Sequence, residues 1–120
     1  SQNVVDKKLV LDQPSSKPLD NQTSENLTKW LDNTFLPRYF NDTSLDEMSY
    51  MMKNVETLGD SRNYEKLKDT TVYQEKGQFI VFADVLLTDK ATNQEEIQSL
   101  KIVIENDKNN KNIVQSIEHY

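Results

Sequence analysis

The stretch FIVFADVLLT, residues 79–88, decides the fold class, because it is apolar at nearly every position and rich in β-branched and aromatic residues. A strand with apolar side chains on both faces is typically buried inside a sheet. The polar stretch Tyr64–Tyr73 precedes it and has the character of a flanking strand, with a turn at Glu75, Lys76 and Gly77 between the two. The sequence therefore predicts a hairpin whose second strand is central.

Two further strands are expected downstream of this hairpin. Over Ile97–Glu105 apolar and polar residues alternate, so one face of the strand packs against a core. The turn-forming residues at 106–110 then reverse the chain into a last strand, which carries Ile113, Val114 and Ile117. Together the four strands predict an antiparallel meander.

The chain before the sheet predicts two amphipathic helices. Ser24 can cap the first, and Pro37 lies inside it, where the missing amide hydrogen should kink or tighten the helix. Ser44 and Glu47 form a capping box for a second helix over about Leu45–Asn54. The apolar face of the first helix consists of Leu27, Trp30, Leu31, Phe35 and Tyr39. The predicted fold class is α+β, with N-terminal helices packed in the concavity of a curved four-stranded antiparallel sheet.

Length and composition limit the organisation and the function. At 120 residues we expect one domain: residues 1–23 as a linker or arm, and residues 24–120 as a single α+β domain. The net charge of −6 provides no basic stripe for nucleic acid. Without cysteine and with two glycines, the sequence offers no thiolate metal site, glycine-rich phosphate loop or nucleophile elbow. No window approaches the roughly 18 to 20 apolar residues that cross a bilayer.

Two ionisable residues are the candidates for chemistry. Asp84 interrupts the apolar run at 79–88, and two interpretations stay open: a general base in a pocket, or an acid on a solvent-facing patch. His119 is the only histidine and the second-last residue, so we expect it to be exposed, without a second histidine for a metal site or triad. No catalytic, cofactor-binding or metal-ligating residue is assigned.

Aromatic and methionine side chains have two interpretations as well. Trp30 and the five tyrosines suit a stacking surface for bases or sugars, but helical spacing favours a role in the core. The cluster of Met48, Met51 and Met52 can line an adaptable groove, although filling irregular core space is the commoner use.

The order of these elements resembles a known family. An aromatic-rich helix around Trp30 and Phe35, the segment SLDEMSY at 44–50, the turn at 58–60 and the four strands resemble TcpC-like conjugation proteins of Gram-positive mobile elements. The resemblance covers roughly residues 24–120. It implies a nuclear-transport-factor-two-like cone, as in the VirB-type bitopic scaffold subunits of type IV secretion systems.

The function that this resemblance implies is structural and non-enzymatic: assembly of a Gram-positive conjugative type IV secretion channel. The chain would be the soluble domain on the extracytoplasmic, cell-wall side of the membrane, anchored by a segment absent from this sequence. Its implied partners are other channel proteins and further copies of itself, for example in a trimer. It implies no direct contact with nucleic acid and no cofactor.

Two other functions stay open at this point. The same cone can host an enzyme or small-ligand site with Asp84 in its pocket, or the chain can be a domain of a cell-surface lipoprotein. A concavity filled by Trp30, Phe35 and Met52 would contradict the pocket, whereas a water-lined hollow with converging ionisable groups would contradict the scaffold. A preceding membrane helix would favour the channel, and a lipobox cysteine the lipoprotein.

Overall fold

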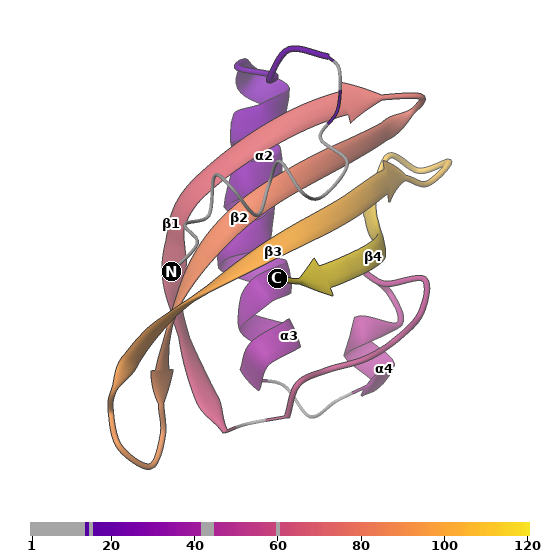
Figure 1. Ribbon diagram of the computed structural model, residues 1–120. Helices are drawn as coiled ribbons and strands as arrows, with labels where there is room; N and C mark the ends of the chain where they lie inside the picture. Colours follow the sequence, from indigo (N-terminus) through magenta and orange to yellow (C-terminus); the bar gives the residue numbers. More distant parts are fainter. Residues whose placement is uncertain (1–13, 15, 42–44, 60) are drawn as a thin grey trace.

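The computed structural model describes residues 14, 16–41, 45–59 and 61–120, so most of the predicted arm lies outside the described residues. The elements in chain order are α2 (Gln22–Trp30), the π-helical turn η1 (Leu31–Phe35), α3 (Leu36–Asn41), α4 (Leu45–Met48), β1 (Arg62–Glu75), β2 (Gln78–Asp89), β3 (Glu95–Asn106) and β4 (Asn112–His119). Figure 1 shows the curved sheet in front of α2 and α3. Among the described residues, no helix has the length and hydrophobicity needed to span a bilayer.

The sheet is the predicted antiparallel meander, with strand order β1-β2-β3-β4. Val81 in β2 lies opposite Val72 in β1 and Ile102 in β3, which confirms that β2 is an interior strand. A two-residue turn joins β1 to β2, and both Lys76 and Gly77 have positive φ, of 51° and 77°. This backbone matches the twist of the flanking strands and suits glycine at the second position.

The first helix begins at Gln22, earlier than predicted, and Asn21 caps it in place of Ser24. The Asn21 side chain accepts a hydrogen bond from the Ser24 amide at 3.1 Å, and the Asn21 amide donates to the Ser24 hydroxyl at 3.0 Å. Ser24 is therefore the third helical residue of a reciprocal capping box, because both side chains satisfy amides that the helix leaves unpaired.

Ahead of Pro37 the helix widens into the π turn η1, so a tightening of the helix at this point, one of the two predicted outcomes, is wrong. The Leu36 amide donates to the carbonyl of Leu31, five residues back. In an α-helix each four-residue step overshoots a full turn by about 40°, so the series Leu27, Leu31, Phe35 would drift around the axis. The wider turn offsets this drift, and Phe35, Leu36 and the residues of α3 keep facing the sheet.

The second helix, α4, ends at Met48 and not near Asn54 as predicted. The backbone beyond it pairs with the sheet: the Val114 amide donates to the Met51 carbonyl at 2.7 Å, and the Lys53 amide donates to the Val114 carbonyl at 2.9 Å. Met52 thereby forms an isolated parallel bridge with Val114. The Met52 amide still donates to the Met48 carbonyl, at 2.9 Å, but the Lys53 amide and the Met51 carbonyl pair with β4 in place of continuing the predicted helix.

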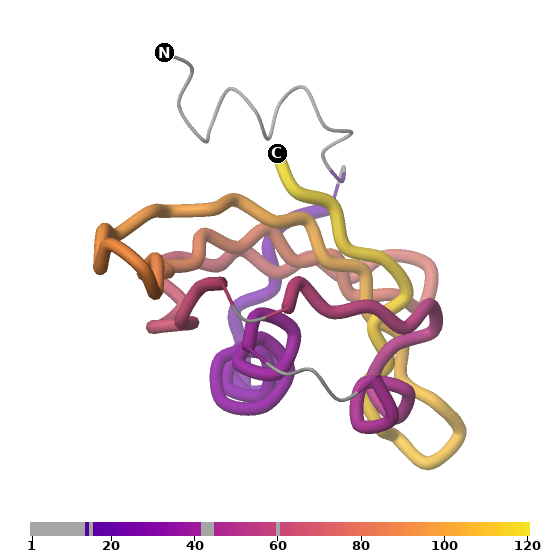
Figure 2. The backbone as a smooth tube through the Cα atoms, turned by 90° about the horizontal axis from the view of Figure 1, so that it is seen from below, coloured from indigo at the N-terminus to yellow at the C-terminus, as the bar shows by residue number. Residues whose placement is uncertain are grey.

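The core lies between the concave face of the sheet and the helices, which Figure 2 shows on one side of the sheet. The helical layer and the sheet contribute to one cluster of buried side chains. Its members are Leu27, Leu31, Phe35, Leu36, Tyr39, Phe40, Met48, Met52, Val72, Phe79, Val81, Ala83, Val85, Leu87, Leu100, Ile102, Ile104 and Val114. The helices thus fill the concavity of the sheet, as predicted.

Candidate functional site

Aromatic side chains fill the inside of the concavity. Phe35 stacks between Trp30 and Tyr39, with ring centroids 5.5 Å and 5.7 Å away, and Phe40 meets Tyr39 edge-on at 5.2 Å. Phe35 and Met52 are buried, and Trp30 packs against the same cluster. The aromatic residues of the first helix and the methionines Met48 and Met52 are therefore core residues, as predicted, whereas Tyr50 is exposed and contradicts the core role expected for it.

Asp84 does not lie in this concavity. In β2 the residues of the core cluster alternate with Asp84, which points from the opposite face of the sheet. There the Ser99 hydroxyl donates to its carboxylate at 2.8 Å, and the Tyr120 amide donates to the Ser99 carbonyl at 3.0 Å. Burial, with a smaller contribution from the charge of Asp84, raises the pKa of Tyr120 to about 12. The interpretation of Asp84 as a pocket base is wrong, because strand alternation places it on the outer face.

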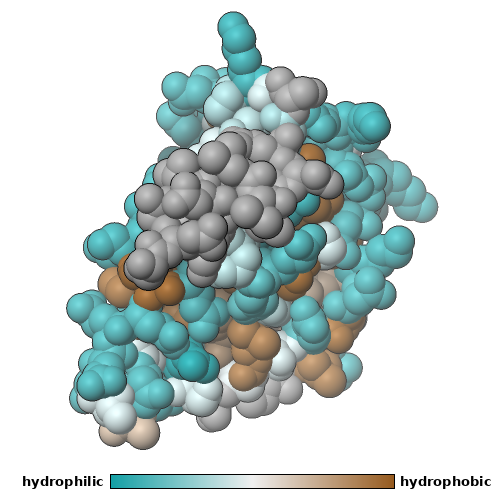
Figure 3. Space-filling model, in the orientation of Figure 1, coloured by the Kyte–Doolittle hydropathy of each residue, from teal (hydrophilic) through white to brown (hydrophobic). Residues whose placement is uncertain are grey.

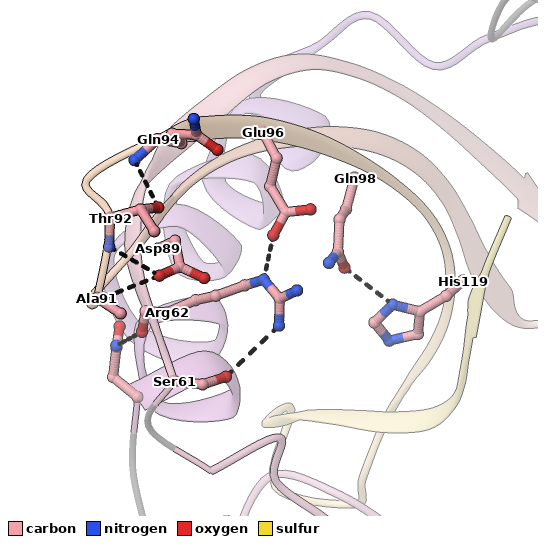
Figure 4. A network of polar contacts seen from close by, with 10 residues as sticks. Ser61, Arg62, Asp89, Ala91, Thr92, Gln94, Glu96, Gln98 and His119 are labelled. Atoms are coloured by element: carbon pink, nitrogen blue, oxygen red, sulfur yellow. Dashed lines mark hydrogen bonds and ion pairs between the residues drawn. The ribbon is translucent and has the colours of Figure 1, made fainter.

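Polar side chains gather where the concave face reaches the ends of the strands. We call Tyr39, Asn41, Arg62, Glu96, Gln98 and His119 the polar rim. Glu96 and Gln98 share the core face of β3, because they lie opposite Leu87 and Val85 of β2. Figure 4 shows Arg62, Glu96, Gln98 and His119 along this side of the sheet.

His119 connects three elements within the polar rim. Its Nε2 lies 2.8 Å from the Tyr39 hydroxyl of α3, and its Nδ1 lies 3.1 Å from the side-chain oxygen of Gln98 in β3. If Nδ1–H donates to the Gln98 oxygen, Nε2 is free to accept the Tyr39 proton, so the two contacts suit one neutral tautomer. The residue is exposed on its outer side, as predicted, but its two partners were not anticipated.

The electrostatic surroundings of this pair favour the neutral forms. Burial lowers the pKa of His119, and the opposing influence of Glu56 is smaller. Burial, together with the negative charge of Glu56, raises the pKa of the Tyr39 hydroxyl well above its usual range. The Tyr39–His119 contact is therefore a hydrogen bond between neutral groups at pH 7.

Asn41 and Arg62 fasten the end of α3 to the start of β1. The Asn41 side-chain oxygen accepts the Tyr64 amide hydrogen at 2.9 Å, and its nitrogen donates to the Arg62 carbonyl. The Arg62 guanidinium pairs with the Glu96 carboxylate across the sheet. These contacts place the rim groups in mutual hydrogen bonds and an ion pair, and they position the backbone of α3 and β1.

Asp32, in the π turn, is a structural residue that the sequence did not single out. One of its carboxylate oxygens accepts the Tyr64 hydroxyl at 2.6 Å and the Leu67 amide at 3.0 Å. Burial and the hydrogen bond to Asp32 raise the pKa of Tyr64 well above its usual range. The four-residue spacing of Leu27, Leu31 and Phe35 is ordinary in an α-helix, so it did not predict the wide turn that carries Asp32.

Two clefts flank α2, and both are open to solvent. The larger, of about 770 Å³, lies between α2 and the edge of β1 and is lined by Pro18, Leu19, Asp20, Ser24, Glu25, Thr28, Lys29, Thr70, Thr71 and Val72. The smaller, of about 270 Å³, lies beside the β3–β4 turn. Neither includes Asp84 or a residue of the polar rim, and the described residues contain no group of three ligands suited to a metal ion.

Comparison with known proteins finds similarity among solved structures. No protein-family model matches the sequence, and no curated protein does. Among solved structures, a protein described as "Ntf2 like protein involved in plasmid conjugation" matches with a TM-score of 0.73 and 12% sequence identity. The match covers 91% of this chain but 47% of that one, so this chain corresponds to about half of the matched protein.

At this identity the likeness shows the fold. The matched frame is the one described above, an N-terminal helix followed by a four-stranded antiparallel sheet. The chain therefore has the nuclear-transport-factor-two-like α+β fold that its sequence suggested.

Proposed function

We propose that this chain is a non-enzymatic assembly domain of a conjugative type IV secretion channel in a Gram-positive bacterium. In this proposal the domain lies on the extracytoplasmic side of the membrane, held there by a segment outside the sequence given. It binds other channel proteins and further copies of itself. The TcpC-like and VirB-type subunits are the classes it would join.

The filled concavity is the observation that carries this proposal. A cone that binds or converts a small molecule needs an interior space with converging polar groups. Here Phe35, Tyr39 and Phe40 occupy that space, and His119 and Arg62 at its margin are bonded to neighbouring side chains. The outer surfaces are then the parts of the domain available for recognition, as an assembly role requires.

The structural match also supports a role in conjugation. The matched protein is described as involved in plasmid conjugation, and its Ntf2-like frame covers nearly all of this chain. A shared fold does not by itself carry a shared role. The proposal therefore needs a direct test of transfer.

The test is a mating experiment with a donor strain whose transferable element carries the gene. Deleting the gene should reduce transfer by orders of magnitude, and the wild-type gene supplied in trans should restore it. Unchanged transfer after deletion would contradict a role in the channel.

A second strain tests the non-enzymatic part of the proposal. His119→Gln retains hydrogen-bonding groups but removes the only imidazole, so it should support wild-type transfer at equal protein level. Loss of transfer with a folded His119→Gln protein would point to chemistry at the polar rim.

A further inference from the structure

The segment at 45–58, which comprises α4 and the chain up to the turn before β1, displays apolar side chains to solvent. Tyr50 is 78% exposed, Leu45 54%, Leu58 44% and Val55 39%. In the described part of the chain these are four of the five exposed large hydrophobic residues, the fifth being Ile97 of β3. Single exposed apolar residues are ordinary, but their concentration in one short segment is typical of an interaction surface.

This apolar segment is anchored to the domain and not a loose loop. Met48 and Met52 are buried in the core, and the backbone on both sides of Met52 pairs with Val114 of β4. Further along, the Leu58 amide donates to the Tyr39 carbonyl at 3.0 Å. Figure 2 shows this stretch running across from β4 towards α3. The inward methionines thus fix a backbone that holds Leu45, Tyr50, Val55 and Leu58 exposed to solvent.

Charge around the apolar segment is mainly negative. Asp46, Glu47 and Glu56 lie within it and are exposed, whereas Lys53 is its only basic residue. The exposed Glu47 carboxylate lies 3.4 Å from the Arg38 guanidinium, and that contact is open to solvent. Figure 3 shows hydrophobic side chains over α4 and the stretch after it, with hydrophilic ones around them. The segment therefore exposes apolar and acidic side chains together.

We propose that the segment at 45–58 docks a partner protein through a stretch in which apolar residues are bordered by lysine or arginine. This inference specifies the partner chemistry of the assembly role and rests on that proposed function. Tyr50 is the expected anchor, since tyrosine is enriched among the residues that dominate binding energy. Asp46 and Glu56 would face the basic side chains and select the partner by charge.

The exposed acidic side chains of the segment distinguish this partner from other occupants. An anionic lipid surface attracts basic segments and repels carboxylates such as Asp46 and Glu56. A second copy docked through the same segment would bring like charges together, which is unfavourable at an interface. A basic, apolar protein segment can cover the exposed apolar side chains and place positive charges beside the carboxylates.

Photocrosslinking in the native host tests this inference. The photoreactive residue p-benzoylphenylalanine replaces Tyr50 in the complete protein, and Ile97 is replaced in the same way as the matched control. After illumination, mass spectrometry sequences the attached peptide. The expected product at position 50 is a peptide of another protein with lysine or arginine beside apolar residues, and position 97 should not give it.

Charge reversal provides the second arm. Asp46→Lys with Glu56→Lys should lower the yield of this product by at least about tenfold, because like charges would then meet across the interface. Glu25→Lys with Glu95→Lys changes the net charge equally on exposed residues elsewhere and should leave the yield unchanged. Circular dichroism of both double variants checks that they are folded.

Several results would overturn the inference: no product at position 50, a product with lipid or a second copy, an attached peptide without basic residues, or equal loss of yield in both double variants. Failure of the proposed function looks different. If mating does not depend on the gene but position 50 still captures the basic peptide, the result supports the docking surface and contradicts the channel role. If mating depends on the gene but position 50 captures lipid or a second copy, the result contradicts the docking surface and leaves the channel role supported.

Discussion

Asp32 connects the helical layer to the first strand, because one carboxylate oxygen accepts hydrogen bonds from the Tyr64 hydroxyl and the Leu67 amide. We expect Asp32→Ala to lower the free energy of unfolding by about 2 to 3 kcal/mol, since hydrogen bonds to a charged group are lost and two donors lose their partner. Asp32→Asn keeps an acceptor oxygen and should cost about 1 kcal/mol. Urea unfolding measures both, and equal values for the two variants would contradict the role of the acceptor.

His119 gives a pH dependence whose sign follows from its lowered pKa. In the unfolded chain the imidazole titrates near 6.5, and in the folded protein it titrates lower. Below about pH 6.5 the unfolded chain therefore binds more protons, and stability falls as the pH drops through the folded pKa. Relative to His119→Gln, wild type should lose unfolding free energy between pH 7 and pH 5.

The single histidine makes the direct measurement unambiguous. An NMR titration of the His119 ring protons should give a midpoint below 6.5 in the folded protein. A midpoint above 6.5 would mean that Glu56, and not burial, controls the imidazole.

The sequence could place Asp84 on a strand and His119 beside the end of the chain, but it could not supply their partners. Tyr39 and His119 are 80 residues apart in the chain, so their contact depends on the packing of α3 against the end of β4. The side that Asp84 faces follows from alternation once the register is known. Apart from Asp84 and Thr88 the run at 79–88 is apolar on both faces, so these two polar residues alone did not decide which face was inside.

Among the elements, the strands were predicted more closely than the helices. β2 spans Gln78–Asp89 where 79–88 was expected, because turn residues bound an apolar run at both ends. α4 ends early because β4 offers backbone partners that are distant in sequence. The capping by Asn21 and the π turn depend on local geometry that composition does not specify.

The methionines around α4 allow a matched test of how this element is anchored. Met48 is fully buried, whereas Met51 is half-buried at the margin of the same core. Met48→Ala should therefore lower the unfolding free energy by about 2 to 4 kcal/mol through the cavity it leaves, and Met51→Ala by less than about 1 kcal/mol. Thermal or urea unfolding of both variants provides the comparison. Equal losses would show that α4 is not held through Met48.

At the scale of the whole molecule, one continuous core joins the helices to the sheet, which predicts a single cooperative unfolding transition. Trp30 is the only tryptophan; it stacks on Phe35 and packs against the core, so its fluorescence reports the contact between the two layers. Far-ultraviolet circular dichroism reports the strands and helices themselves. The two signals should change at the same urea concentration, with calorimetric and van't Hoff enthalpies equal. If the Trp30 signal changed first, the helices would leave the concavity while the sheet persisted, and the filled interior would not be what holds the molecule together.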